Sequence, residues 1–168
     1  IKTNHDNGGV VIVWDETKIN WGKVRSRLKN KLKRNYFYRN REWPYLNIKP
    51  CIVVEKLLLD ENNKIPIDFK VHCFHGKAKM ITIDLDRFGQ HKQNFYDPDW
   101  NILDCRWYFP IGEGIPKPEG LAEMVNLAEK LADNFLYVRV DLYLVNGHTY
   151  FGEMTFYQGG GLEKFDFE

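Results

Sequence analysis

The chain has 168 residues, of which 43% are hydrophobic and 15% aromatic, and this content suits one domain with a real hydrophobic core. Its 24 Lys and Arg residues nearly balance 23 Asp and Glu residues, so the net charge of +1 argues against a dedicated nucleic-acid binder. Three cysteines without C-x-x-C spacing, and apolar runs well short of the roughly 20 residues that span a bilayer, predict a cytoplasmic protein without a disulfide framework or a transmembrane segment.

The first third of the chain predicts two strands and one helix. Residues 8–15 (GGVVIVWD) form a short β-branched run after a glycine turn, and residues 51–59 (CIVVEKLLL) form a continuous apolar run, so a strand is expected in each. Asn20 can cap a helix with apolar residues at spacings of three and four. This apolar stripe comprises Trp21, Val24, Leu28 and Leu32.

The remainder predicts two hairpins and a second helix. Residues 67–86 form two strands around Gly76, and Asn146-Gly147 is a strong hairpin signal between the last two strands. Residues 87–101 are expected to be an irregular excursion, and a helix with apolar periodicity follows Pro118 and ends near residue 134. This mixed order predicts an α+β fold with a mostly antiparallel sheet flanked by helices.

The last hairpin carries a candidate metal site. Asp141 and Glu153 lie about equally far from the turn, so they are expected near one another across the strands, with Arg139 and Thr155 on the same face. Hard oxygen ligands at this spacing suit Mg²⁺. The alternative interpretation is a surface network of Arg, Asp and Glu side chains.

The start of the chain carries a candidate phosphate loop. Lys2 precedes a polar segment closed by Gly8-Gly9, and backbone N–H groups in such a loop can bind phosphate oxygens. It lacks the Walker sequence, and an ordinary turn is the alternative. Glu55-Lys56, at the end of an apolar run, could read an adenine edge through backbone groups.

Two further features have simpler explanations beside their functional ones. The basic residues between Lys23 and Arg34 could contact nucleic acid or an anionic lipid surface, or form a solvated helix face. The five histidines lack H-x-x-x-H and H-E-x-x-H spacing, so no zinc site is expected.

Six segments in order resemble the TupA-like ATP-grasp proteins of bacterial cell-surface polysaccharide and teichuronopeptide biosynthesis. They are IKTNHDNGG, NREWPYLNIKP, DFKVHCFHGK, DRFGQHKQNFYD, VRVDLYLVNG and YFGEMTFYQGGGLEKF. The resemblance implies an ATP-grasp domain over residues 1–168, and a fragment that lacks the N-terminal subdomain and the C-terminal end of the family.

The resemblance also implies roles for individual residues. Lys2 and the loop Asn7, Gly8 and Gly9 would bind the phosphates of ATP, Glu55, Lys56 and Leu57 would bind adenine, and Asp68 would bind ribose. Asp141 and Glu153 match the Mg²⁺ ligands, and Arg139 matches the basic residue near the transferred phosphate. Thr155 stands where the superfamily commonly has asparagine, and its hydroxyl is a weaker ligand.

The activity implied is a Mg²⁺- and ATP-dependent carboxylate–amine ligase, acting through an acyl phosphate in capsule or exopolysaccharide biosynthesis. Its substrates would be small-molecule or sugar-linked carboxylates and amines. Two alternatives are a phosphotransferase that uses the same nucleotide site on a sugar hydroxyl, and a non-catalytic binding module of a polysaccharide-assembly system.

Overall fold

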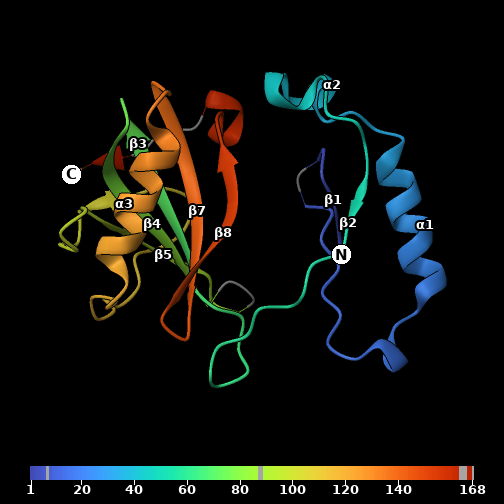
Figure 1. Cartoon of the computed structure of the whole chain (residues 1–168), viewed down its shortest axis with the longest axis horizontal. Helices are drawn as coiled ribbons and strands as arrows, with labels where there is room; N and C mark the ends of the chain where they lie inside the picture. Colours follow the sequence, from blue (N-terminus) through green and yellow to red (C-terminus); the bar gives the residue numbers. More distant parts are fainter. Residues whose placement is uncertain (7, 87–88, 163–165, 168) are drawn as a thin grey trace. The chain divides into compact units, whose positions relative to one another are not determined.

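The structure, a computed structural model, describes residues 1–6, 8–86, 89–162 and 166–167 (Figure 1). By its internal contacts the chain divides into two compact units, Ile1–Leu57 and Leu58–Glu168. Within the described ranges, no helix is both long and apolar enough to cross a membrane. Each unit is described by itself.

The first unit is a helix beside a very short strand pair. Strand β1 (Lys2–Thr3) pairs antiparallel with β2 (Ile52–Val53). Helix α1 (Trp21–Leu32) begins at the predicted cap, since the Asn20 side chain accepts a hydrogen bond from the Lys23 amide at 2.9 Å. The other elements are η1 (Glu16–Lys18), α2 (Phe37–Asn40) and η2 (Trp43–Tyr45).

The two strands predicted in this unit are wrong in extent. Residues 8–15 form no strand, and only Ile52–Val53 of residues 51–59 are paired. The side chains of Val10 and Val54 are 52% and 73% exposed, so these apolar runs are not drawn into a buried sheet. A β-branched run becomes a strand only where a neighbouring strand offers it a partner.

The second unit contains a five-stranded antiparallel sheet with the order β5-β4-β3-β7-β8. Its strands are β3 (Asp68–Phe74), β4 (Lys77–Leu85), β5 (Lys92–Tyr96), β7 (Tyr137–Val145) and β8 (His148–Thr155). A small pair, β6 (Cys105–Arg106) with β9 (Asp166–Phe167), and the turn η3 (Gln158–Gly161) complete the unit with helix α3 (Leu121–Ala132).

Both hairpin turns agree with the sequence, whereas β5 contradicts it. His75-Gly76 has φ values of 49° and 73°, and Asn146-Gly147 has 51° and 75°, as two-residue turns between twisted strands require. The expected irregular excursion over residues 87–101 is wrong at its centre, because Lys92–Tyr96 pair with β4, and its residues 87 and 88 lie outside the described residues. The α+β class and the mostly antiparallel sheet are confirmed.

The sheet has one apolar face and one polar face. Helix α3, drawn in orange, packs over the sheet and contacts β3, β4 and β7 (Figure 1). Its buried side chains join a core that includes Phe69, Val71, Ile81, Val140 and Leu142. Because side chains alternate along a strand, the intervening residues of β3 and β7 share the opposite face, which carries the charged groups described next.

Candidate functional site

The segment that follows β1 is held in place by contacts within its own unit. His5 Nε2 lies 2.9 Å from the carbonyl oxygen of Arg34 and 3.3 Å from that of Lys31, beside the C-terminal end of α1. Carbonyls only accept, so Nε2 carries the ring proton. The Cys51 amide donates to Asn4 Oδ1 at 2.8 Å. The segment is therefore tied both to α1 and to the β2 side of the unit.

Gly8 and Gly9 are each required by this backbone, for different reasons. Gly8 has a φ of 74°, in the left-handed region that favours glycine. A Cβ on Gly9 would lie 2.7 Å from Thr3 Oγ1 and 2.8 Å from Asp6 Oδ1. Arg27 on α1 donates to the Gly8 carbonyl at 3.3 Å. The glycine pair thus closes a packed loop rather than a free turn.

The predicted adenine and phosphate residues of the first unit come together only in part. Lys2 Nζ lies 2.9 Å from Glu55 Oε2, in a pair whose side chains are 36% and 57% exposed. An exposed pair of this kind is weak and can exchange partners. Lys56 and Leu57 follow β2 without regular structure. Asn7 lies outside the described residues.

In the second unit, the β7–β8 hairpin gathers the predicted metal and catalytic residues around one guanidinium group. Asp141 pairs directly with Glu153, and Arg139 pairs with Thr155. Arg139 donates from Nε to Asp141 Oδ1 at 2.7 Å and from Nη2 to Asp141 Oδ2 at 2.8 Å. It also donates to Thr155 Oγ1 and to Gln158 Oε1, both at 3.1 Å, and Nη2 is 3.6 Å from Glu153 Oε1.

A β-bulge at Gly152 sets this arrangement. Leu142 pairs with Phe151 while Asp141 pairs with Glu153, so Gly152 is an extra residue on β8. A Cβ at Gly152 would lie 2.9 Å from the Asp141 carbonyl oxygen. The bulge reverses the alternation of β8 and brings Glu153 to the face of Asp141.

The ligand types of the hairpin fit Mg²⁺, although Arg139 already occupies them. Two carboxylates and a hydroxyl supply hard oxygens, and the Glu153 side chain is 63% exposed and can reach solvent. Burial raises the pKa of Asp141 to about 7, and Arg139 opposes this effect. Across the described ranges, no group of three or more His, Cys, Asp or Glu side chains is placed to hold a metal ion. A cation here would need further ligands from phosphate and water.

Asp68, the predicted ribose residue, lies in a separate charge network on the polar face. Lys70 Nζ lies 2.7 Å from both Asp68 Oδ2 and Asp84 Oδ2, and Gln93 Nε2 donates to Asp84 Oδ1 at 2.9 Å. Lys70 pairs with Asp141 across β3 and β7, and its own side chain is buried. The network therefore adjoins the hairpin cluster.

His72 completes the buried part of this face. Its Nδ1 is 3.1 Å from the Tyr137 hydroxyl, and its Nε2 is 3.1 Å from Thr82 Oγ1. Burial, together with the nearby charges of Arg139 and Lys70, lowers the pKa of His72 to about 3. The ring is consequently neutral at pH 7 and adds no positive charge beside Arg139.

The sequence interpretation missed Lys70, His72, Asp84 and Gln158. A signal for the first two was present, because Asp68, Lys70 and His72 recur with a period of two along β3 and so share one face. The partnership of Lys70 with Asp84 depends on the register of β3 with β4, which no local pattern gives.

A family model described as TupA-like ATPgrasp covers residues 1–168. A search of the curated proteins and a search of the solved structures found no match.

Proposed function

The chain belongs to the TupA-like ATPgrasp family, and from this premise we propose that it is a Mg²⁺-dependent carboxylate–amine ligase. The family makes it an ATP-grasp protein and supports nucleotide binding and an ATP-dependent activity. The proposal adds the reaction, an amide bond formed at the expense of ATP, and its place in cell-surface polysaccharide biosynthesis.

One observation supports the reaction most directly: two carboxylates lie opposite each other on β7 and β8 with a guanidinium beside them. Paired carboxylates repel each other, and a buried one disfavours ionisation unless cations are near. Arg139 relieves part of this repulsion at Asp141, and Glu153 retains an exposed side chain. We assign Asp141, Glu153 and Thr155 as Mg²⁺ ligands, and Arg139 as the group that neutralises the transferred phosphate.

The nucleotide roles follow the family resemblance and the packing of the first loop. Lys2, Gly8 and Gly9, with Asn7, would hold the phosphates, and Glu55, Lys56 and Leu57 would hold adenine through their backbone. The packing of Gly9 against Thr3 and Asp6 supports this assignment, because backbone groups that are already positioned lose little entropy when they bind an anion. Asp68 would accept from a ribose hydroxyl, with Lys70 keeping its carboxylate oriented.

The chemistry needs no nucleophile from the protein. A substrate carboxylate attacks the γ-phosphate, ADP leaves, and an acyl phosphate forms; an amine then attacks the acyl carbon and phosphate departs. Bound Mg²⁺ supplies positive charge to the phosphate oxygens. The chain's own part is positioning and charge: Arg139 and Lys2 offset negative charge that builds up during transfer.

The test is ADP release by the full-length protein supplied with Mg²⁺, ATP, amino acids and cell-surface sugar precursors. Asp141→Asn and Glu153→Gln should each lower turnover by about a hundredfold or more, because each removes a charge and a metal ligand. Glu123→Gln, an exposed carboxylate on α3, is the matched control and should retain activity. Near-normal ADP release by either hairpin variant would remove that residue from the ligand set.

Product analysis in the same experiment decides the reaction type. Mass spectrometry should find an amide together with free phosphate. A phosphorylated sugar would instead establish a phosphotransferase, and the absence of ATP turnover with every substrate would favour a binding module.

A further inference from the structure

The first unit has a pocket that the proposed ligase site does not use. It is a hollow of about 420 Å³ where α1 ends and α2 begins. We call it the α1–α2 pocket, and its lining includes Asp6, Lys31, Arg34, Tyr36, Tyr38 and Arg39. All of these residues lie within Ile1–Leu57, so the pocket belongs to one compact unit.

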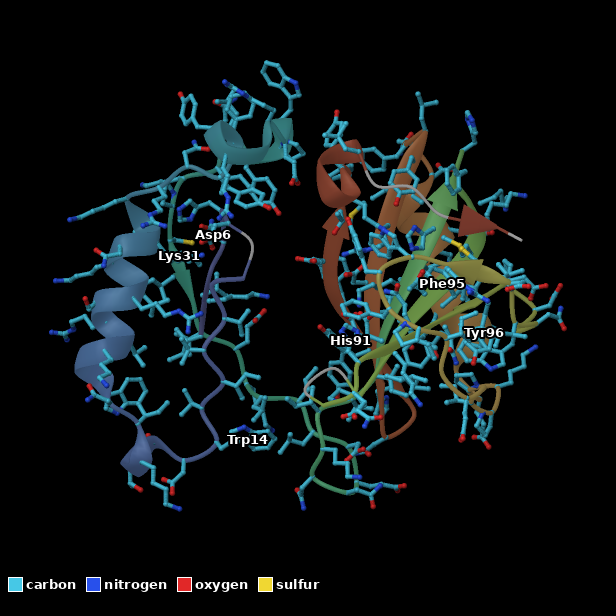
Figure 2. The ribbon with its side chains drawn as sticks, turned by 180° about the vertical axis from the view of Figure 1, so that it is seen from behind. Asp6, Trp14, Lys31, His91, Phe95 and Tyr96 are labelled. Atoms are coloured by element: carbon cyan, nitrogen blue, oxygen red, sulfur yellow. The ribbon has the colours of Figure 1, made fainter. Side chains whose placement is uncertain are left out.

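Two lining residues of the pocket form a half-buried ion pair. Lys31 Nζ lies 2.7 Å from Asp6 Oδ2, and the two side chains, labelled in Figure 2, are 26% and 5% exposed. Thr3 Oγ1 donates to the other oxygen of Asp6. His5 ties the same segment to the carbonyls of Lys31 and Arg34. Asp6 and Lys31, together with the backbone at the end of α1, are therefore held in place without a ligand, whereas Arg34, Tyr38 and Arg39 are exposed.

The rim of the pocket carries an excess of positive charge. Three cations against the single carboxylate of Asp6 give a net charge of +2. The side chains of Arg34 and Arg39 are exposed, and among the described residues no ion pair joins either of them to a carboxylate. Residues 17–41 contain ten Lys and Arg residues and no Asp or Glu, so the surroundings do not neutralise the rim.

The pocket also presents aromatic rings. Tyr36 packs edge-on against Tyr45 with ring centroids 5.0 Å apart, which fixes its orientation. Tyr38 packs against Phe37 at 5.4 Å and leaves 68% of its surface exposed. A tyrosine held in this way offers an apolar face and a hydroxyl to a flat or ring-shaped ligand at low entropic cost.

We propose that the α1–α2 pocket binds a phosphate monoester carried on a sugar ring. A monoester dianion matches the net charge of +2 better than a single carboxylate does, and two guanidinium forks suit tetrahedral phosphate oxygens. The ring then lies against Tyr38. This site goes beyond the proposed ligase chemistry. It uses none of the residues assigned to the nucleotide, although Asp6 lies between Lys2 and Gly8 in the sequence. The proposal therefore stands whether or not the chain proves to be a ligase.

The test is calorimetric titration of the full-length protein at 150 mM NaCl with glucose 1-phosphate as probe, and with glucose, inorganic phosphate and ADP as comparisons. Arg34→Gln combined with Arg39→Gln should weaken binding of glucose 1-phosphate by about tenfold or more, since two charge-assisted contacts are lost. Arg25→Gln with Lys29→Gln, exposed on α1 away from the pocket, is the matched control and should change it by less than about twofold.

The comparisons separate the phosphate from the ring and from the nucleotide. Glucose should not bind, and Tyr38→Ala should weaken glucose 1-phosphate but leave inorganic phosphate unchanged. Equal losses in the two double variants would reduce the effect to general surface charge and overturn the proposal. The proposal would also be overturned if the unmodified protein did not bind glucose 1-phosphate. It would be overturned too if the Arg34→Gln, Arg39→Gln variant lost only ADP binding, because the pocket would then belong to the nucleotide site.

Discussion

Replacing Arg139 with methionine tests whether the hairpin cluster depends on its guanidinium. Methionine keeps much of the length and apolar volume of the arginine stem but removes every donor. Asp141, only 3% exposed, would then lose both of its Arg139 hydrogen bonds, and the acceptor oxygens of Thr155 and Gln158 would lose theirs. The variant should unfold more easily, and by an amount that depends on pH.

The expected loss follows from burial and from the pKa of Asp141. Removing one partner of a buried ion pair typically costs about 3–5 kcal/mol of unfolding free energy. Burial already raises this pKa to about 7, and without Arg139 it must rise further. At a pH between the pKa of Asp141 in the folded wild type and its higher pKa in the folded variant, the folded variant keeps a proton on Asp141. The folded wild type and the unfolded chain have released that proton. The difference between the proteins should therefore grow by up to about 1.4 kcal/mol per pH unit above pH 7.

The assay is urea unfolding of both proteins at pH 6 and pH 8.5, with Asp141→Asn and the double variant in a full cycle. The loss in Arg139→Met should be clearly larger at pH 8.5. The double variant should lose less than the sum of the two single variants, because it leaves no unpaired charge. Equal losses at the two pH values together with additive single variants would refute the reasoning.

Three further predictions concern other parts of the chain. His72→Gln should remove a histidine contribution to stability that falls by up to about 1.4 kcal/mol per pH unit as pH drops from 6.5 towards 3, because the unfolded histidine takes up a proton that the folded one refuses. Urea unfolding of both proteins at pH 7, 6 and 5 measures this as a difference in slope, since the raised pKa of Asp141 contributes the same opposite slope to both, and identical slopes would contradict the prediction. Gly9→Ala should cost about 1–3 kcal/mol in the same assay at pH 7, whereas Gly114→Ala, whose added Cβ meets nothing closer than 4.0 Å, should cost less than about 0.5. Lys2→Met should weaken ATP binding in calorimetry more than Lys33→Met on the basic surface does, and equal effects would argue against the phosphate assignment.

Local signals in the sequence were sufficient for the two hairpin turns and for helices α1 and α3, but not for the short helix α2. Asn146-Gly147 and His75-Gly76 define hairpins because positive φ at two successive residues is a property of those residues themselves. Helix α1 begins at Asn20 because a cap needs only the side chain and the next turn. The hairpin turn placed Asp141 and Glu153 at nearly the same distance along their strands, but their direct pairing depends on the bulge at Gly152, which the sequence interpretation did not predict.

Strand partners lay beyond what the sequence could show. Strand β5 reads as polar, yet Gln93 and Asn94 are buried in it because Asp84 accepts from Gln93 and the Glu113 carbonyl accepts from Asn94. A hydrophobic pattern does not predict the burial of a polar side chain that donates a hydrogen bond to a partner distant in the sequence. Residues 8–15 show the reverse error, since Val11 exchanges backbone hydrogen bonds with Ile1 at 2.8 and 2.9 Å but the run forms no strand.

The bulge at Gly152 limits how related chains can differ in length. Each residue inserted or deleted in β8 between Gly147 and Glu153 moves that glutamate to the other face of the strand, so only changes in pairs keep it on the face that carries Asp141. Loss of the bulge residue alone would turn Glu153 towards the core side, where Met154 now packs. Insertions in this hairpin of related chains should therefore contain an even number of residues or lie within the turn itself. An odd number of inserted residues in an active relative would indicate a second β-bulge that returns the glutamate to the face of Asp141.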